Sequence, residues 1–123
     1  MIRVYQDKSK NILSTKKFIM EENSVIIGEG VLSLSEECIS IIHAKVDEGL
    51  PFNYYDLLIR SMLHSVRDTG DIEIRILCDA VSPSCYFEHN EKSQLYKKLG
   101  FIKQQSCYTV LAKNINFKGN CNG

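Results

Sequence analysis

QLYKKLGF, at residues 94–101, is the stretch that decides the fold of this 123-residue chain. It ends a polar run of about two helical turns that begins near Asn90 and reaches Leu99. Gly100 follows directly, and glycine readily adopts the left-handed backbone conformation that ends many helices. The next residues, FIKQQSCYTVLAK, predict either one long strand or two short ones.

The segment before this motif predicts a longer helix and then a strand. Apolar residues recur at helical spacing on one face from about Asn53 to Asp68. They are Tyr55, Leu58, Ile59, Met62 and Val66. Asn53 can cap the first turn, Asp56 stands where a capping box places an acid, and Gly70 ends the helix. Strict alternation in DIEIRIL, residues 71–77, predicts the strand.

The first 46 residues predict four strands joined by short links. Their ranges are 2–5, 16–22, 25–34 and 38–46. Asn23 and Ser24 read as a turn between the second and third strands, and within the third strand Ile27, Glu29 and Val31 are expected to share one face. Tight links predict an antiparallel meander. The long helix that follows can form a crossover, so we expect a mixed sheet.

Length and composition predict a single domain over residues 1–123, with a flexible tail from about residue 115. Fifteen Lys and Arg balance fifteen Asp and Glu, so no net charge attracts nucleic acid or an anionic membrane. No apolar run reaches the roughly 20 residues of a membrane helix, and the first residues lack the apolar centre of a signal peptide. We therefore expect a cytoplasmic protein without a nucleic-acid or membrane partner. The sequence contains neither a C-x-x-C nor an H-E-x-x-H spacing, so it predicts no metal site.

The pattern L-Y-x-K-L-G-F resembles the C-terminal motif of the GNAT superfamily of acyl-CoA N-acyltransferases. The matching residues are Leu95, Tyr96, Lys98, Leu99, Gly100 and Phe101. The order of strands and helices across residues 16–112 is also similar to that family. The resemblance implies an α+β fold with a mixed, mostly antiparallel sheet and two main helices. It also implies that the strands near residues 38–46 and 72–77 splay apart into a V, and that acetyl-CoA or another acyl-CoA binds in the gap.

In that family, the loop after the first splayed strand carries a Q/R-x-x-G-x-G/A pattern whose backbone N–H groups bind the CoA pyrophosphate at a helix N-terminus. Counting from Val46, this chain has Pro51 in place of the Gln or Arg. Tyr54 stands at the first glycine and Asp56 at the last small residue, and both the bulk and the charge oppose phosphate binding. By resemblance, the cofactor-binding positions are Val46, Pro51, Phe52, Asn53, Tyr54, Tyr55 and Asn90.

Asn90 is the weakest match among these positions. It precedes Tyr96 by six residues, whereas the asparagine common in the family precedes the tyrosine by seven. Its side chain can instead cap the second helix.

The resemblance also names candidates for the chemistry. Tyr96 occupies the position at which many family members place the acid that protonates the departing CoA thiolate; alternatively, its ring simply packs on the sheet. Family members often carry a Glu on the first splayed strand as base, but Ser40 stands there in this chain. His43 is the nearby residue whose ordinary pKa suits proton abstraction near neutrality, although a histidine in a strand is more often half-buried and hydrogen-bonded.

About ten polar residues separate the first two predicted strands, too few for the two helices that family members usually place there. The acceptor side is therefore either truncated or supplied by another subunit, and a homodimer is plausible on this ground. Two functions stay open. The first is an N-acyltransferase that acts on an unknown small-molecule or protein amine. The second is a non-catalytic binding or assembly module that has lost CoA binding.

Overall fold

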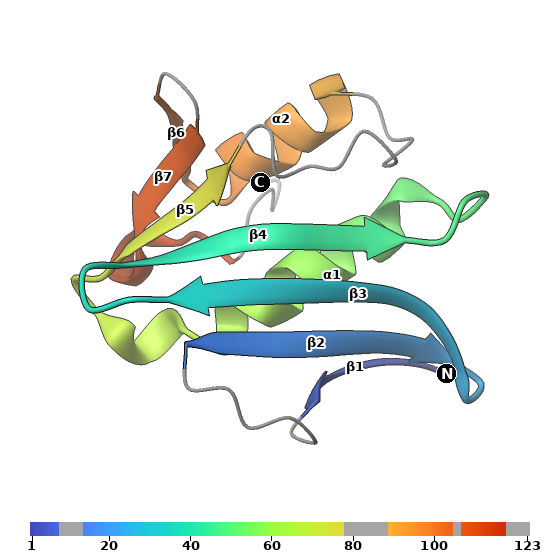
Figure 1. The fold of residues 1–123 in the computed structure, drawn as a ribbon. Helices are drawn as coiled ribbons and strands as arrows, with labels where there is room; N and C mark the ends of the chain where they lie inside the picture. Colours follow the sequence, from blue (N-terminus) through green and yellow to red (C-terminus); the bar gives the residue numbers. More distant parts are fainter. Residues whose placement is uncertain (8–13, 78–88, 105–106, 118–123) are drawn as a thin grey trace.

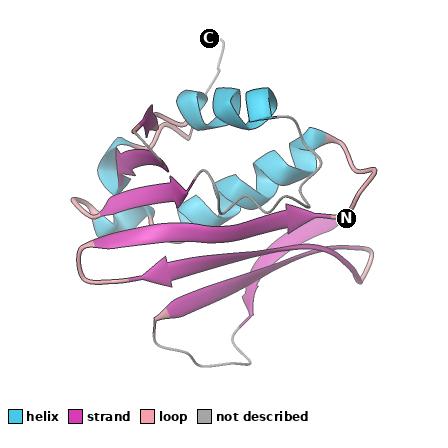
Figure 2. Ribbon diagram, turned by 45° about the horizontal axis from the view of Figure 1, so that its top comes forward, coloured by secondary structure: helices cyan, strands magenta, loops and turns pink. Residues whose placement is uncertain are grey.

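A mixed sheet with two helices packed on one of its sides forms the computed structural model (Figures 1 and 2), which describes residues 1–7, 14–77, 89–104 and 107–117. The elements are β1 (Ile2–Asp7), β2 (Thr15–Glu22), β3 (Val25–Leu34), β4 (Cys38–Val46), α1 (Phe52–His64), η1 (Arg67–Thr69), β5 (Glu73–Leu77), α2 (His89–Lys98), β6 (Ile102–Lys103), β7 (Cys107–Leu111) and η2 (Ala112–Asn114). The strand order is β1-β2-β3-β4-β5-β7-β6. Only β4 and β5 pair in parallel within the described part of the chain.

This arrangement confirms the predicted α+β class. The first four strands form an antiparallel meander, and α1 carries the chain across to the parallel strand β5. Asn23 and Ser24 both have positive φ angles, 53° and 71°, as a tight hairpin turn with right-handed strand twist requires. The link between β1 and β2 is too short for a pair of helices, as expected.

The sheet splays apart between β4 and β5. The two strands pair only from Cys38 to Ile41, opposite Glu73–Ile76, whereas β4 continues to Val46. Where they stop pairing, β4 also contains one residue more than β3: Val31 lies opposite His43 but Leu32 lies opposite Ile41. Such a bulge bends and twists a strand. Figure 1 shows β4 and β5 diverging from this point, which confirms the predicted V.

The stripe of apolar residues predicted for α1 is buried against the sheet. Tyr55, Leu58, Ile59, Met62 and Val66 are each at most 2% exposed. On β3, Gly28, Gly30 and Leu32 lie on the side that α1 covers, and Ile27, Glu29 and Val31 alternate with them along the strand. Glycines at these positions let the helix approach the strand closely, since a side chain at Gly30 would collide with Met62.

The predicted capping of α1 is wrong at its N-terminus. The N-cap residue is Pro51, and Asn53 lies inside the first turn. Asp56 does not cap either, since its carboxylate forms an ion pair with Arg60 one turn along. At the other end, the helix stops at His64 rather than near residue 68. There the Ser65 hydroxyl donates to a helix carbonyl in place of a further turn of backbone bonds.

The QLYKKLGF motif, residues 94–101, forms the end of α2 and the turn after it. Gly100 has a φ angle of 100°, its N–H donates to the carbonyl of Lys97, and the N–H of Phe101 donates to the carbonyl of Tyr96. These two bonds are a Schellman motif, and the rings of Tyr96 and Phe101 supply its hydrophobic contact at 6.3 Å. The helix begins at His89, so Asn90 lies within its first turn and not at the cap position.

After β7 and η2, the chain returns across α1 and α2. The backbone N–H of Asn116 donates to the carbonyl of Leu99 at 2.8 Å, and the guanidinium of Arg60 donates to the carbonyl of Phe117 at 2.8 Å. The rings of Phe117 and His64 stack with centroids 3.9 Å apart. The expected flexible tail starts at about residue 115, and its greater part, residues 118–123, lies outside the described residues. Within the part of the chain that the structure describes, no helix is long and apolar enough to cross a bilayer.

Candidate functional site

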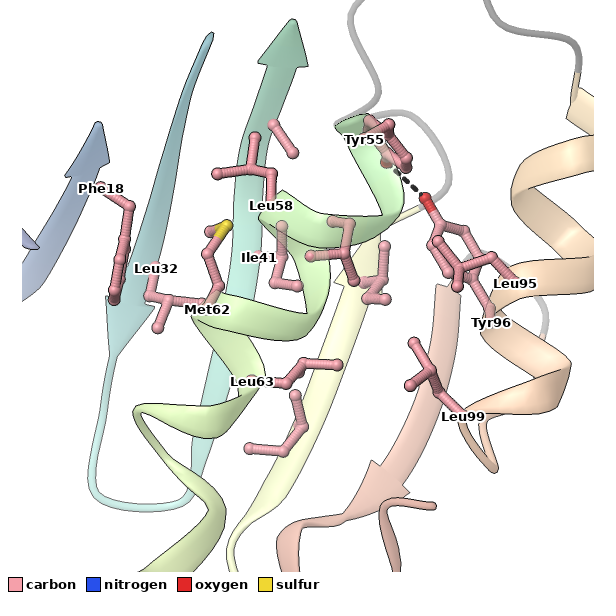
Figure 3. Packing of buried hydrophobic residues seen from close by; sticks show 14 of the residues in the cluster. Phe18, Leu32, Ile41, Tyr55, Leu58, Met62, Leu63, Leu95, Tyr96 and Leu99 are labelled. Carbon is pink, nitrogen blue, oxygen red and sulfur yellow. Dashed lines mark hydrogen bonds between the residues drawn. The ribbon is translucent and has the colours of Figure 1, made fainter. Parts of the chain in front are cut away.

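Two tyrosine hydroxyls meet where the two helices close over the splayed part of the sheet. The hydroxyl oxygens of Tyr55 on α1 and Tyr96 on α2 lie 2.7 Å apart. The side chains are almost fully buried, with exposed fractions of 1% and 3%. Figure 3 shows the bond between the start of α1 and α2, near the end of the sheet at which β4 stops. The structure therefore places the candidate acid in a hydrogen bond that the sequence reasoning did not foresee.

An aromatic cluster surrounds this pair. The ring of Tyr108 from β7 meets the ring of Tyr96 edge-on with centroids 5.0 Å apart, and the ring of Phe52 lies 5.6 Å from that of Tyr55. The Tyr108 hydroxyl donates to Ser93 on α2 at 3.0 Å. Residues of α1, α2 and β7 thus fix the orientation of both rings.

Lys92 is the buried charged side chain of the described residues, with an exposed fraction of 5%. Its ammonium nitrogen lies 5.6 Å from the centroid of the Tyr55 ring, within the range of a cation–π interaction. Lys92 precedes Tyr96 by four residues on the same helix, so the two side chains share a face. That spacing was visible in the sequence, but nothing in it indicated that a lysine would be buried there.

The loop expected to bind pyrophosphate leads directly into α1. No acidic residue occupies the first turn of the helix, and the N-cap Pro51 forms no side-chain hydrogen bond. Gly49 has a φ angle of 90° and open space on the side where a Cβ would lie. No N-cap side chain therefore occupies the positive end of this helix, where a Ser or Asp cap would lie.

The two substitutions that oppose phosphate binding both point their side chains elsewhere. The Tyr54 hydroxyl donates to the carboxylate of Glu22 at 3.3 Å, on the β2 side of the helix. Desolvation, and secondarily the negative charge of Glu22, raise the pKa of Tyr54 above its ordinary value. Asp56 is paired with Arg60, which compensates its charge. Neither side chain has to lie over the first backbone amides of the helix.

The other predicted cofactor residues are distributed between the core and the surface. Val46 is 3% exposed and Phe52 packs against the core, whereas Pro51 and Asn53 are exposed at the helix start. The side chain of Asn90 lies outside the described residues. The structure thus brings Val46, Phe52, Tyr55 and Tyr96 into one cluster but leaves Pro51 and Asn53 on its rim.

His43 lies on the other side of the sheet from both helices. Its neighbours Ile41 and Ala44 are buried under α1, and the β4 bulge turns His43 outward. Its Nε2 atom lies 3.3 Å from Oε2 of Glu29 on the adjacent strand. The carboxylate can therefore orient the imidazole. The two candidate catalytic residues, His43 and Tyr96, therefore lie on opposite sides of the sheet and not beside one another.

A small groove separates the outer faces of α1 and α2. Its lining residues are Phe52, Asp56, Arg60, Glu91, Gln94, Leu95 and Lys98, and its volume is about 170 Å³. Its lining combines acidic side chains (Asp56, Glu91), basic side chains (Arg60, Lys98) and the apolar Phe52 and Leu95. The sequence did not predict this groove because it depends on how two helices distant in the chain lie against each other. Within the described residues, no group of His, Cys, Asp and Glu side chains could hold a metal ion.

Known protein structures share this fold, although the sequence itself matches no family model and no curated protein. The ribosomal-protein-S18-alanine N-acetyltransferase of Escherichia coli superposes with a TM-score of 0.69 at 10% identity, over 89% of each chain. The IAA acetyltransferase of Bacillus cereus ATCC 14579 gives 0.65 at 13% identity, over 85% of this chain and 79% of the other.

A GNAT family acetyltransferase of Elizabethkingia anophelis, solved with acetyl-CoA bound, is also similar. It gives a TM-score of 0.63 at 16% identity, over 85% of this chain and 78% of the other. The alignments with these three proteins cover at least 78% of each chain. The chain therefore has the fold of the GNAT N-acetyltransferases.

Proposed function

We propose that this protein is an N-acyltransferase that moves an acyl group from acetyl-CoA, or a related acyl-CoA, to an amine. The observation that carries the proposal is the Tyr96 hydroxyl, held by the helix-ending motif close to the open end of the splay between β4 and β5. A hydroxyl at that place can give a proton to a sulfur that enters the gap. The fold shared with acetyltransferases supports the same function.

The start of α1 supports a site for the CoA pyrophosphate. Its backbone is not capped by a side chain, and it carries no acidic residue in the first turn. The positive end of the helix dipole favours an anion there. Because Tyr54 bonds to Glu22 and Asp56 to Arg60, the departures from the usual glycine pattern do not remove this property. Phe52 and Asn53 lie at the first positions of the helix and would be the nearest side chains.

The acid and base would act from the two sides of the sheet. Acyl transfer needs a base to take a proton from the amine and an acid to protonate the departing thiolate. We assign the acid to Tyr96 and the base to His43, which the Glu29 carboxylate orients at 3.3 Å. The acceptor would then approach over the face of the sheet that α1 and α2 leave open (Figure 2). That open face suits either a small amine or the amine of a protein, and a second subunit would have room to cover part of it.

One observation favours the non-catalytic alternative. Tyr96 is 3% exposed and its hydroxyl already has a partner, so the aromatic cluster fills space that a thioester would have to approach. A protein that uses the fold only for binding or assembly could keep this cluster as plain core packing. The two functions differ in whether the chain binds acyl-CoA.

Calorimetric titration with acetyl-CoA and with CoA separates them. We expect micromolar binding by the wild type, and weaker binding in Asn53→Asp because the new charge lies in the first turn of α1. Asn114→Asp, the same change at an exposed position in η2, is the matched control and should bind like the wild type. CoA release with a panel of small amines and N-terminal peptides then identifies the acceptor class. No binding by the wild type would favour the binding or assembly module.

A further inference from the structure

We infer that Tyr55 is a positioning residue for the acid step, acting through Tyr96, and that Lys92 assists it by its charge; the inference rests on the acyltransferase function proposed above. A tyrosine on α2 as the acid follows from resemblance to the family. The second tyrosine on α1 and the buried lysine follow only from the contacts in this structure.

The distance between the two hydroxyls is that of a well-formed hydrogen bond. Hydroxyl oxygens bonded to each other in proteins lie most often about 2.7–2.8 Å apart, and the Tyr55 and Tyr96 oxygens lie at 2.7 Å. Both side chains are at most 3% exposed, so the bond lies in surroundings where hydrogen bonds are stronger than in water. A change at one hydroxyl must therefore affect the other.

The proton balance of the acid step shows what Tyr55 supplies. The amine nitrogen bonds to the thioester carbon, the carbon–sulfur bond breaks, and its electron pair stays on sulfur. The sulfur takes the hydroxyl proton of Tyr96, whose oxygen becomes a phenolate. Tyr55 donates its own hydroxyl to that phenolate and keeps its proton. The proton from the amine passes to His43 and then to solvent, and solvent returns one proton to Tyr96.

Tyr55 can serve in this way only if it donates to Tyr96 and not the reverse. In that direction the bond to Tyr55 does not hold the Tyr96 proton, and this proton can be transferred to the sulfur. A hydrogen bond to a charged group is stronger than one between neutral groups, so Tyr55 stabilises the phenolate more than the neutral phenol. Such an interaction speeds the chemical step and changes binding little.

Lys92 adds positive charge next to the same pair. Its ammonium is 5.6 Å from the Tyr55 ring centroid, and the residue is only 5% exposed. Burying a charge is costly unless it has a compensating interaction. An aromatic ring and a transient phenolate both provide one, which gives the burial of this lysine a role. The neighbouring Tyr108 hydroxyl is already bonded to Ser93 and needs no part in it.

The first test is spectroscopic and needs no substrate. In protein labelled with ¹³C at the tyrosine Cζ atoms, the Tyr96 resonance reports ionisation of its hydroxyl. We expect ionisation at a higher pH in Tyr55→Phe than in the wild type, and a smaller change in the same direction in Lys92→Met. As controls, Tyr5→Phe on β1 also loses one part-buried hydroxyl bond, and Lys97→Met removes an exposed lysine of α2; both should leave the titration of Tyr96 unchanged. Equal titration of Tyr96 in the wild type and in Tyr55→Phe would overturn the inference.

The second test uses turnover of acetyl-CoA with the best amine of the panel. Tyr55→Phe should lower kcat by about tenfold, the value expected for losing one hydrogen bond to a charged group, while KM for acetyl-CoA stays within about twofold. Tyr5→Phe, on β1 and outside the candidate site, should change kcat by less than about twofold. An unchanged kcat in Tyr55→Phe, in a wild type that binds and turns over acetyl-CoA, rejects the role of Tyr55 alone. Loss of acetyl-CoA binding by the wild type itself would instead reject the proposed function, and the spectroscopic result would still show whether the two tyrosines are coupled.

Discussion

Gly30 of β3 lies directly under Met62 of α1, so closely that a Cβ atom on Gly30 would be 2.5 Å from the methionine sulfur. Replacing Gly30 by Ala should lower the free energy of unfolding by about 1–3 kcal/mol, the usual cost of inserting a carbon into a packed core. The clash involves the end of a flexible side chain, so a shorter partner should relieve it. We expect Gly30→Ala to cost less in a Met62→Leu background than in the wild type.

Denaturant unfolding of the two single variants and the double variant measures this coupling. Gly28→Ala is the matched control, because its Cβ would meet the backbone carbonyl of Lys45 at 2.8 Å rather than a side-chain end. Met62→Leu should not rescue it. Strictly additive effects of Gly30→Ala and Met62→Leu would show that the helix does not rest on this glycine.

Alanine substitutions at Gly49 and Gly100 distinguish the cost of a strained backbone conformation from the cost of a steric contact. Both have positive φ angles, 90° and 100°, but a Cβ on Gly49 meets nothing within 4 Å, whereas one on Gly100 lies 3.1 Å from the carbonyl of Asn114. Gly49→Ala should therefore cost only the left-handed conformation, about 1–2 kcal/mol. Gly100→Ala should cost more, since it adds a contact with a backbone carbonyl in the Schellman motif.

Thermal and denaturant unfolding of the two variants gives both values. If Gly100→Ala cost no more than Gly49→Ala, the turn after α2 would have to move freely. The position of Tyr96 would then not depend on the motif that ends its helix.

Patterns within single elements predicted most of the fold. The stripe on α1 and the glycine that ends α2 are local, since period and cap chemistry involve residues within a turn or two of each other. The order of the elements then left few ways to arrange the sheet, because a helix between β4 and β5 allows a parallel crossover. A mixed sheet could therefore be expected from the sequence, whereas the splay between β4 and β5 was implied only by the resemblance to the GNAT superfamily.

The predictions that were wrong or missing concern features that depend on contacts which the local sequence pattern does not show. Asn53 and Asp56 fit a capping box in isolation, but Arg60 binds the carboxylate of Asp56 and the helix starts earlier, at Phe52. The extra residue in β4 and the buried glycines of β3 depend on pairing between strands, which no single strand reveals. The contact of Tyr55 with Tyr96 joins residues 41 positions apart and could not be read from either helix.

His64 should make stability depend on pH in the mildly acidic range. Desolvation, and then the positive charges of Arg67 and Arg60, lower the pKa of His64 below its ordinary value of 6.5. The folded state therefore binds its proton less readily than the unfolded chain, so the contribution is present above the ordinary pKa and is lost as the pH falls. The side chain is largely exposed, so the loss should be only a few tenths of a kcal/mol.

Unfolding free energies of the wild type and His64→Gln between about pH 8 and about pH 5, roughly one and a half pH units on either side of the ordinary pKa, test this. As the pH falls, the free energy of unfolding should decrease more in the wild type than in His64→Gln. Phe117→Leu should reduce the shift, since stacking of Phe117 contributes to the desolvation of the imidazole. A difference that stays constant with pH would contradict the assignment.

Tyr54 should ionise at a higher pH than an ordinary tyrosine. Desolvation, the larger cause, and the Glu22 carboxylate both raise its pKa. Since the folded state holds this proton more tightly than the unfolded chain, stability falls as the pH rises above the ordinary value of 10.0. In the ¹³Cζ-labelled protein, Glu22→Gln should move the Tyr54 titration only part of the way toward that value, because desolvation remains. Glu48→Gln removes a charge from the exposed loop before α1 and should leave it unchanged. A complete return to the ordinary value in Glu22→Gln would mean that the carboxylate alone perturbs Tyr54, and that its ring is not packed against the core.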